Sequence, residues 1–215
     1  MTPIYHITHV DNLHRVLEEG ELVCDAESAR RQLCQQSIAY ETLKERRART
    51  QVVCNDGGSV AAGGMLADYV PFYFTNRSPM LFVIHKGGVE GYTGGQTNVV
   101  YLVSSVEAVA ASGRVWCFTD GHAVEEVSEF YDKVADLERV DWDVIQSWSW
   151  KNTLADLDRK RRKQAEFLVH ERFPWELVSQ IGVINPTMAT RVTTMIGRAA
   201  HRPQMAIEPN WYYNV

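Results

Sequence analysis

One glutamate stands inside an apolar, strand-like run, and this feature limits the possible folds more than any other. The run is Gln164-Ala165-Glu166-Phe167-Leu168-Val169, and five cations precede it, from Arg159 to Lys163. Strand interiors disfavour glutamate, and burying a carboxylate is costly unless its charge is paired or used. A second polar side chain, His6, lies in the short segment Tyr5-His6-Ile7-Thr8-His9. Together the two segments predict one active site built from both halves of the chain.

The composition is that of an ordinary globular protein, with 215 residues, 45% hydrophobic and 23% charged. We expect one domain over residues 1–215. No apolar run approaches the ~20 residues of a membrane span, and no signal segment is recognisable, so we expect no membrane partner. The four cysteines, Cys24, Cys34, Cys54 and Cys117, lack zinc-site spacing. We therefore expect no metal and a cytoplasmic protein.

The net charge of −5 is unevenly distributed. One basic cluster contains Lys44, Arg46, Arg47 and Arg49, and the other is the block 159–163. Local fields matter more than net charge to a polyanion, so both clusters are compatible with nucleic acid. They are equally compatible with solvated faces, and the first also with cations favoured at a helix C-terminus. The sequence leaves these alternatives open.

Hydrophobic periodicity predicts an α+β protein with a mixed or antiparallel central sheet and surrounding helices. We expect strands at 3–7, 68–74, 98–104, 115–118, 164–169, 181–184 and 205–207, and helices at 8–20, 37–49, 79–85, 106–111, 123–137 and 186–199. Thr8 is expected to open the first helix and Gly20 to end it. Pro71 indicates an edge strand or a bulge. Residues 21–35 are expected to be irregular, and 50–67, with Gly57-Gly58 and Gly63-Gly64, a flexible loop.

Common enzyme signatures such as GxGxxG, GxxxxGK[ST], HExxH and GxSxG are absent. A lone strand histidine is more often a core residue than a catalytic one, but a buried glutamate needs a partner or a task. Cleavage of the N-glycosidic bond of NAD would use both. A carboxylate can stabilise the cationic ribose carbon as nicotinamide departs, and a histidine on a neighbouring strand can hold the ribose.

Several ordered blocks resemble the DarT toxins over nearly the whole chain. They are Tyr5-His6-Ile7-Thr8-His9, Glu45-Arg46-Arg47, Asp68-Tyr69-Val70-Pro71-Phe72-Tyr73-Phe74, Arg77-Ser78-Pro79-Met80-Leu81 and Gln164-Ala165-Glu166-Phe167-Leu168-Val169. The resemblance implies an ADP-ribosyltransferase-like fold. It also implies sequence-specific transfer of ADP-ribose from NAD to thymine N3 in single-stranded DNA, which releases nicotinamide and blocks replication. It implies a DarG-like macrodomain antitoxin as partner.

The resemblance also implies roles for particular residues. Glu166 and Arg47 correspond to the catalytic pair, with Arg47 as proton acceptor, although an arginine more readily stabilises an anion than accepts a proton. The residues expected to bind NAD are His6, Ile7, Thr8, Arg15, Val23 and Arg47. Those expected to contact DNA are Arg77, Ser78, Pro79, Met80, Leu81, Phe82, His122, Trp148, Ser149, Trp150, Arg159 and Lys160. Aromatic rings beside cations suit single strands, whereas core packing is the other interpretation of Trp148 and Trp150.

Two alternatives stay open from the residues alone. The same enzyme class could act on guanine or RNA, and a module could bind single strands without catalysis. The loop 50–67 is longer and richer in glycine than the family leads us to expect, so its contacts are undefined.

Overall fold

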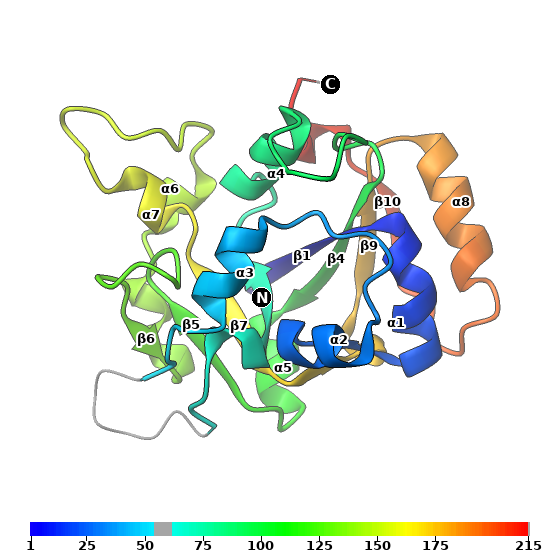
Figure 1. The fold of residues 1–215 in the computed structure, drawn as a ribbon, viewed down its shortest axis with the longest axis horizontal. Coiled ribbons are helices and arrows are strands. Elements are labelled where there is room, and N and C mark those ends of the chain that lie inside the picture. Colours follow the sequence, from blue (N-terminus) through cyan, green and yellow to red (C-terminus); the bar gives the residue numbers. More distant parts are fainter. Residues whose placement is uncertain (54–61, 215) are drawn as a thin grey trace.

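The computed structural model describes residues 1–53 and 62–214, which form a large, mostly antiparallel sheet surrounded by short helices (Figure 1). The main sheet has the order β10-β9-β4-β1-β3-β7-β5-β6, and only its β9–β10 pair is parallel. A second sheet pairs β2 with β8. The strands are β1 Pro3–His9, β2 Glu21–Val23, β3 Tyr69–Tyr73, β4 Val99–Ser105, β5 Trp116–Thr119, β6 Phe130–Tyr131, β7 Glu166–His170, β8 Arg172–Pro174, β9 Gln180–Val183 and β10 Gln204–Ile207. The predicted α+β class is confirmed.

Helices cover the sheet in separate groups. Their bounds are α1 Leu13–Glu19, α2 Asp25–Arg31, α3 Glu41–Arg47, α4 Pro79–His85, α5 Val106–Ala111, α6 Trp142–Gln146, α7 Arg159–Arg162 and α8 Pro186–Ile196. Figure 1 shows α1 beside α8 at one end of the sheet, while α6 and α7 stand at the other end in a projecting loop. Among the described residues, no helix combines the length and apolar character needed to cross a bilayer.

Local sequence explains where several helices begin and end. Ser78 precedes α4, and its hydroxyl accepts a hydrogen bond from the backbone N–H of Leu81 at 3.1 Å. Gly20 ends α1 in the left-handed conformation, with φ of 71°. Central strands are apolar on both faces, as in β4, because helices and loops cover both sides of the sheet.

The sheet opens between β1 and β3. Their ladder has a single Cα pair, Tyr5↔Tyr73, whereas β1 pairs with β4 along its whole length. His6 lies at this opening, and its Nδ1 is 2.8 Å from the backbone oxygen of Pro71. Since a carbonyl can only accept, His6 Nδ1 carries the proton. The opening gives a ligand access to the centre of the sheet.

The expected position of Pro71 at an edge is wrong, because β3 lies between β1 and β7 in the interior of the sheet. A proline is tolerated there because the ladder to β1 is already open. Other local predictions also fail. Thr8 belongs to β1, so the first helical turn starts after His9, and residues 21–35 contain β2 and α2.

The expected helix at 123–137 is wrong as well. This segment contains turns, the short strand β6 and part of a 3-10 helix at Val134–Arg139. The Gly57-Gly58 pair lies outside the described residues. The expected helix at 37–49 is shortened to α3, which ends at Arg47.

Candidate active site

A buried ion pair joins α3 to β7. Arg47 Nη1 donates to Glu166 Oε2 at 2.7 Å, and the two residues are 5% and 2% exposed. They are 119 residues apart in the sequence. A buried pair of this kind holds its charges in a fixed place, because separating them would leave an uncompensated charge in the interior. The structure thus brings the two predicted catalytic residues together.

Glu166 is oriented by backbone as well as by Arg47. Its Oε1 accepts from the backbone N–H of Ala123 at 3.1 Å. Its own N–H donates to Thr119 Oγ1 at 3.1 Å, and that hydroxyl donates to Gly121 O at 2.6 Å. Glu166 begins β7 directly opposite Tyr73 of β3. The carboxylate is therefore fixed at the sheet opening before any ligand arrives.

Arg47 has one further carboxylate near it. Its Nη2 donates to Leu66 O at 3.3 Å, and its Nε is 3.8 Å from Asp25 Oδ2, beyond hydrogen-bonding distance. Nε is buried without a hydrogen-bond partner. Burial opposes the charge of Arg47, but Glu166 and Asp25 outweigh it and raise the pKa of Arg47. Arg47 therefore stays protonated and keeps an unused donor.

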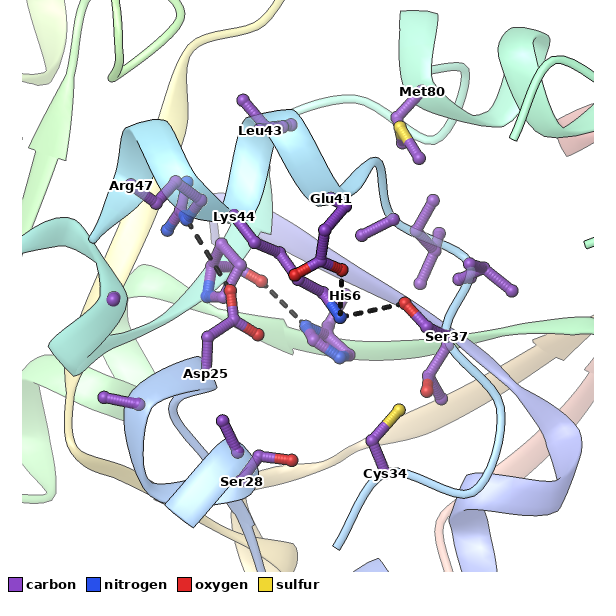
Figure 2. A pocket seen from close by; sticks show the side chains of 18 of the residues that line it. His6, Asp25, Ser28, Cys34, Ser37, Glu41, Leu43, Lys44, Arg47 and Met80 are labelled. Carbon is purple, nitrogen blue, oxygen red and sulfur yellow. Dashed lines mark hydrogen bonds and ion pairs between the residues drawn. The ribbon is translucent and has the colours of Figure 1, made fainter. Parts of the chain in front are cut away.

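A cavity of about 500 Å³ reaches the ion pair from the sheet opening. Figure 2 shows α3 lying across it, with Lys44 and Glu41 projecting toward His6 and with Asp25 below Arg47. Its lining combines backbone and side chains from β1, α2, α3 and β3 with Glu166 and His122. Burial lowers the pKa of His6, so its imidazole is neutral at neutral pH. The cavity thus reaches from a neutral His6 to the Arg47–Glu166 ion pair.

His122 and Tyr73 complete the surroundings of the carboxylate. His122 Nε2 is 4.0 Å from Glu166 Oε1, and its Nδ1 is 3.7 Å from Glu125 Oε1. Burial lowers the pKa of His122 even though both carboxylates oppose that shift. Burial, reinforced by Glu166, raises the pKa of Tyr73. At neutral pH the site therefore offers a neutral imidazole and a neutral phenol beside one ion pair.

The outer part of the cavity has its own polar group. Lys44 Nζ is 2.9 Å from Ser37 Oγ and 4.0 Å from Glu41 Oε2 (Figure 2). Asn12 fastens the adjacent loop, since its side chain bonds the backbone of Gln36 through both its oxygen and its nitrogen. The loop and α3 therefore hold Lys44 over the pocket. Its ammonium group donates to the Ser37 hydroxyl and has only a distant carboxylate partner in Glu41.

The residues expected to bind NAD fall into two groups. His6, Ile7, Thr8, Val23 and Arg47 all line the cavity. Arg15 does not, because its exposed side chain pairs with Glu18 on α1 at 2.7 Å. The expectation for Arg15 is therefore not supported by its position.

The residues expected to contact DNA also divide by exposure. Ser78, Pro79 and Leu81 are buried, so the predicted contacts of their side chains are not supported. Met80 lines the cavity, and Phe82 packs edge-on against Trp150 with ring centroids 5.4 Å apart. Trp148 is 71% exposed, so core packing is excluded for this ring. Ser149 is exposed as well.

Four cations of the block 159–163 are engaged within their own loop. Arg159 donates to Ser149 O and Ser147 Oγ, Arg161 pairs with Asp120 and Asp158, and Arg162 pairs with Asp141 and Asp156. Lys163 is 1% exposed and donates to Ile145 O and Ser147 O. Lys160 is exposed, with no side-chain bond recorded among the described residues. Most of the block thus builds the loop, and the DNA contacts of Arg159 and Lys160 remain predictions.

Sequence reasoning missed several cavity residues. Asn12, Asp25, Lys44 and Tyr73 line the cavity but were not expected there. Tyr73 could have been found, since it lies in one of the family-like blocks. Asp25 and Asn12 carry no local signal, because their roles depend on contacts made by distant loops. In the described part of the chain, no group of three or more His, Cys, Asp or Glu side chains could hold a metal.

An opened antiparallel sheet, a carboxylate fixed at the opening and a helix across the cavity together form a candidate active site in which a fixed negative charge faces a bound ligand. A family model described as "ssDNA thymidine ADP-ribosyltransferase, DarT" matches residues 5–213. The chain belongs to this family.

Similarity to known proteins of this family extends over nearly the full length of the chain. A DNA ADP-ribosyl transferase of Thermus sp. (strain 2.9) is 41% identical over 214 residues, covering 99% of this chain and 96% of the relative. A structure of Thermus sp. 2.9 DarT in complex with ADP-ribosylated ssDNA has a TM-score of 0.90 and 40% identity, with 99% and 96% of the two chains covered. The structure of that protein in complex with NAD+ has a TM-score of 0.85 and 38% identity, with 99% and 98% covered. The predicted family, fold and enzyme class are confirmed.

Proposed function

We propose that this DarT-family enzyme is the toxin of a toxin–antitoxin pair, and that it blocks replication by transferring ADP-ribose from NAD to N3 of thymine at particular single-stranded DNA sequences. NAD is the co-substrate, and thymidine in single-stranded DNA is the acceptor that the family defines. The observation that carries the proposal is the buried Arg47–Glu166 pair at the end of a cavity of about 500 Å³.

The reaction breaks the bond between the ribose carbon and the nicotinamide nitrogen. The electron pair of this bond stays on the nitrogen, so nicotinamide leaves as a neutral molecule. Thymine N3 then bonds to that carbon and loses its proton. Glu166 supplies a fixed negative charge near the developing cationic carbon, and its orientation by Ala123 and Arg47 avoids reorganisation during the reaction. We expect Tyr73, opposite Glu166 in the sheet, to limit the space for the leaving nicotinamide.

The NAD diphosphate needs cationic or hydrogen-bonding partners. Two cations of the described chain line the cavity. Arg47 forms a close ion pair with Glu166, whereas the Nζ of Lys44 lies 4.0 Å from the nearest carboxylate oxygen of Glu41. We therefore expect Lys44 and Ser37 to bind the diphosphate, and His6 to hold the ribose through its neutral imidazole. A cation from α3 placed over the cavity supports this orientation (Figure 2).

The proton of thymine N3 needs an acceptor. The raised pKa of Arg47 makes it a poor base, so we infer that Arg47 stabilises the developing thymine anion. His122 is neutral and 4.0 Å from Glu166, which places it to accept the proton. Transfer should fall as the pH drops below the lowered pKa of His122. His122→Gln should abolish this acid limb and slow transfer about 10²-fold, and an unchanged pH profile would contradict the assignment.

The partners follow from the same proposal. We expect single-stranded DNA as substrate, a DarG-like macrodomain protein as antitoxin and activity in the cytoplasm. Family membership supports the antitoxin, and the exposed Trp148 supports a surface on which bases can stack.

The proposal is tested with oligonucleotides and mass spectrometry. The wild-type protein and NAD are incubated with matched single strands that contain one thymine in varied contexts, or guanine in its place, and with RNA equivalents. We expect one ADP-ribose on thymine in a subset of DNA contexts, with fragmentation that places it at N3. Transfer to guanine or to RNA instead would contradict the proposal that thymine in DNA is the acceptor. Binding of the oligonucleotides without any transfer would favour a non-catalytic binding module.

A further inference from the structure

Two aromatic rings from separate segments of the chain lie against the guanidinium group of Arg77. Its guanidinium carbon is 4.2 Å from the ring centroid of Trp148 and 4.4 Å from that of Tyr213. Trp148 belongs to the loop that projects beyond α6, and Tyr213 to the C-terminal segment. We call the stack of Trp148, Arg77 and Tyr213 the Arg77 clasp. It connects the loop, the segment before α4 and the C-terminal segment.

The guanidinium of Arg77 is already used within the protein. Its Nη1 donates to Asn210 O at 3.3 Å and to Tyr212 O at 3.2 Å, while its Nε is buried without a hydrogen-bond partner. Two aromatic rings also lie against the guanidinium group. The two carbonyls and the two rings hold this side chain against the C-terminal segment and the loop. Its placement therefore favours a role in fixing the loop over direct phosphate binding.

Tyr213 is anchored strongly enough to support such a stack. Its N–H donates to Gln96 Oε1 at 3.0 Å, and its backbone oxygen accepts from Gln96 Nε2 at 2.6 Å. Its hydroxyl donates to Ser78 O at 3.2 Å, and Phe82 packs edge-on with ring centroids 5.2 Å apart. Gln96 is 7% exposed. The C-terminal segment therefore forms the rigid back of the clasp.

Trp148 is the front of the clasp. The residue is 71% exposed although one face lies on Arg77. An exposed indole held by a cation behind it can stack with a nucleobase, and it does not have to be ordered when DNA binds. Arg is better suited than Lys to this place because its planar group stacks on rings.

We propose that Arg77 and Tyr213 are positioning residues for the acceptor strand: the clasp holds the Trp148 ring as a fixed stacking surface for a base next to the target thymine. This inference rests on the proposed function for the identity of the strand. The rigidity of the loop does not depend on it, and the two can be tested apart.

The first test needs neither NAD nor DNA. Amide hydrogen exchange at residues 147–150 is compared in the wild type, Arg77→Leu, Arg77→Lys and Tyr213→Leu, with the exposed Arg114→Leu as control. We expect at least about 10-fold faster exchange in the three clasp variants, because opening becomes easier locally, and none in the control. Unchanged exchange in Arg77→Leu and Tyr213→Leu would overturn the proposal even if the enzyme has another substrate. NAD binding by calorimetry shows that each variant is folded.

The second test separates positioning from phosphate binding. We expect each of the variants Arg77→Leu, Arg77→Lys and Tyr213→Leu to raise the KM for a thymine-containing oligonucleotide about 10-fold, as expected for loss of a base–aromatic stack. The dependence of this KM on salt concentration should stay as in the wild type. A phosphate contact predicts instead that Arg77→Leu alone flattens the salt dependence by about 0.7 in slope and that Arg77→Lys restores it. That result would overturn the proposal.

Discussion

Charged side chains gather in the cavity around Glu166 and in the loop at residues 120–163, and the two regions neutralise them differently. In the cavity, one buried arginine lies near two carboxylates, Glu166 and Asp25, and keeps an unused Nε donor. In the loop, Arg161 and Arg162 are each bonded to aspartates of the same loop. The cavity thus keeps a hydrogen-bond donor available for a ligand, whereas the charged side chains of the loop mostly bond one another and hold the loop in shape.

This difference shows how a basic block should be interpreted. The sequence alone left open whether the cations 159–163 contact DNA or form a solvated face, because the answer depends on which aspartates lie next to them in space. The buried Arg47–Glu166 pair differs from this block, since its net charge is small but it lines a cavity of about 500 Å³.

The largest expected effect is on the stability contributed by the cavity pair. Arg47→Met leaves Glu166 buried without its counter-ion, so the free energy of unfolding in urea should fall by about 3–5 kcal/mol. Adding Glu166→Gln removes the uncompensated charge, so the double variant should regain much of the loss. The matched control is Arg15→Met, an exposed arginine paired with Glu18, which should change stability by about 0.5 kcal/mol or less. Additive losses in the double variant would show that the pair is not a unit.

A second prediction concerns Lys163, the buried cation of the loop. Burial, reinforced by Arg159 and Arg77, lowers the pKa of Lys163 from its usual value to about 8. Between pH 8 and the unfolded value of about 10.5 the unfolded chain binds more protons, so this group makes the folded state more stable as the pH rises.

The difference in unfolding free energy between the wild type and Lys163→Met should therefore shift in favour of the wild type by up to about 1.4 kcal/mol per pH unit in that interval. Urea unfolding at several pH values measures it, and other titrating groups cancel in the comparison. A constant difference across the interval would mean that the pKa of Lys163 is not lowered.

The smallest expected effect separates the one outward-facing cation of the block from its paired neighbours. Lys160→Met should weaken binding of a single-stranded oligonucleotide and flatten its salt dependence by about 0.7 in slope. Arg161→Met should leave the slope unchanged while lowering stability, because Arg161 bonds Asp120 and Asp158. If the two variants have the same salt slope, the distinction between structural and exposed cations in this loop fails.

The buried position of Glu166 and the central strands could be predicted because their signals are local. Glu166 interrupts an apolar run, Gly20 ends a helix, and the continuous apolar residues of β7 fit a strand buried on both faces. The family-like blocks then supplied Arg47, which has no such signal and is indistinguishable in sequence from Arg46 and Arg49.

What could not be predicted depends on contacts between distant segments. Pro71 suggested an edge because its missing N–H is a local property, whereas the opening between β1 and β3 that accommodates it is not. Asp25 lies near Arg47 only because α2 and α3 line the same cavity, and Tyr213 meets Arg77 only after the C-terminal segment has folded back onto the sheet. Turn-rich residues 123–137 resemble a helix in their periodicity, but the hydrogen bonds of Ala123 to Glu166 and of Ser128 to Arg161 hold them in another form.

The most direct test of the account is a single-turnover comparison of the wild type and Glu166→Gln, with NAD and a single-stranded oligonucleotide containing one thymine. The substitution keeps the size of the side chain and its hydrogen-bonding oxygen but removes the charge. The account predicts that transfer slows by about 10²–10³-fold or more while NAD still binds. Transfer at the wild-type rate would contradict it, because Glu166 would then have no part in stabilising the cationic ribose.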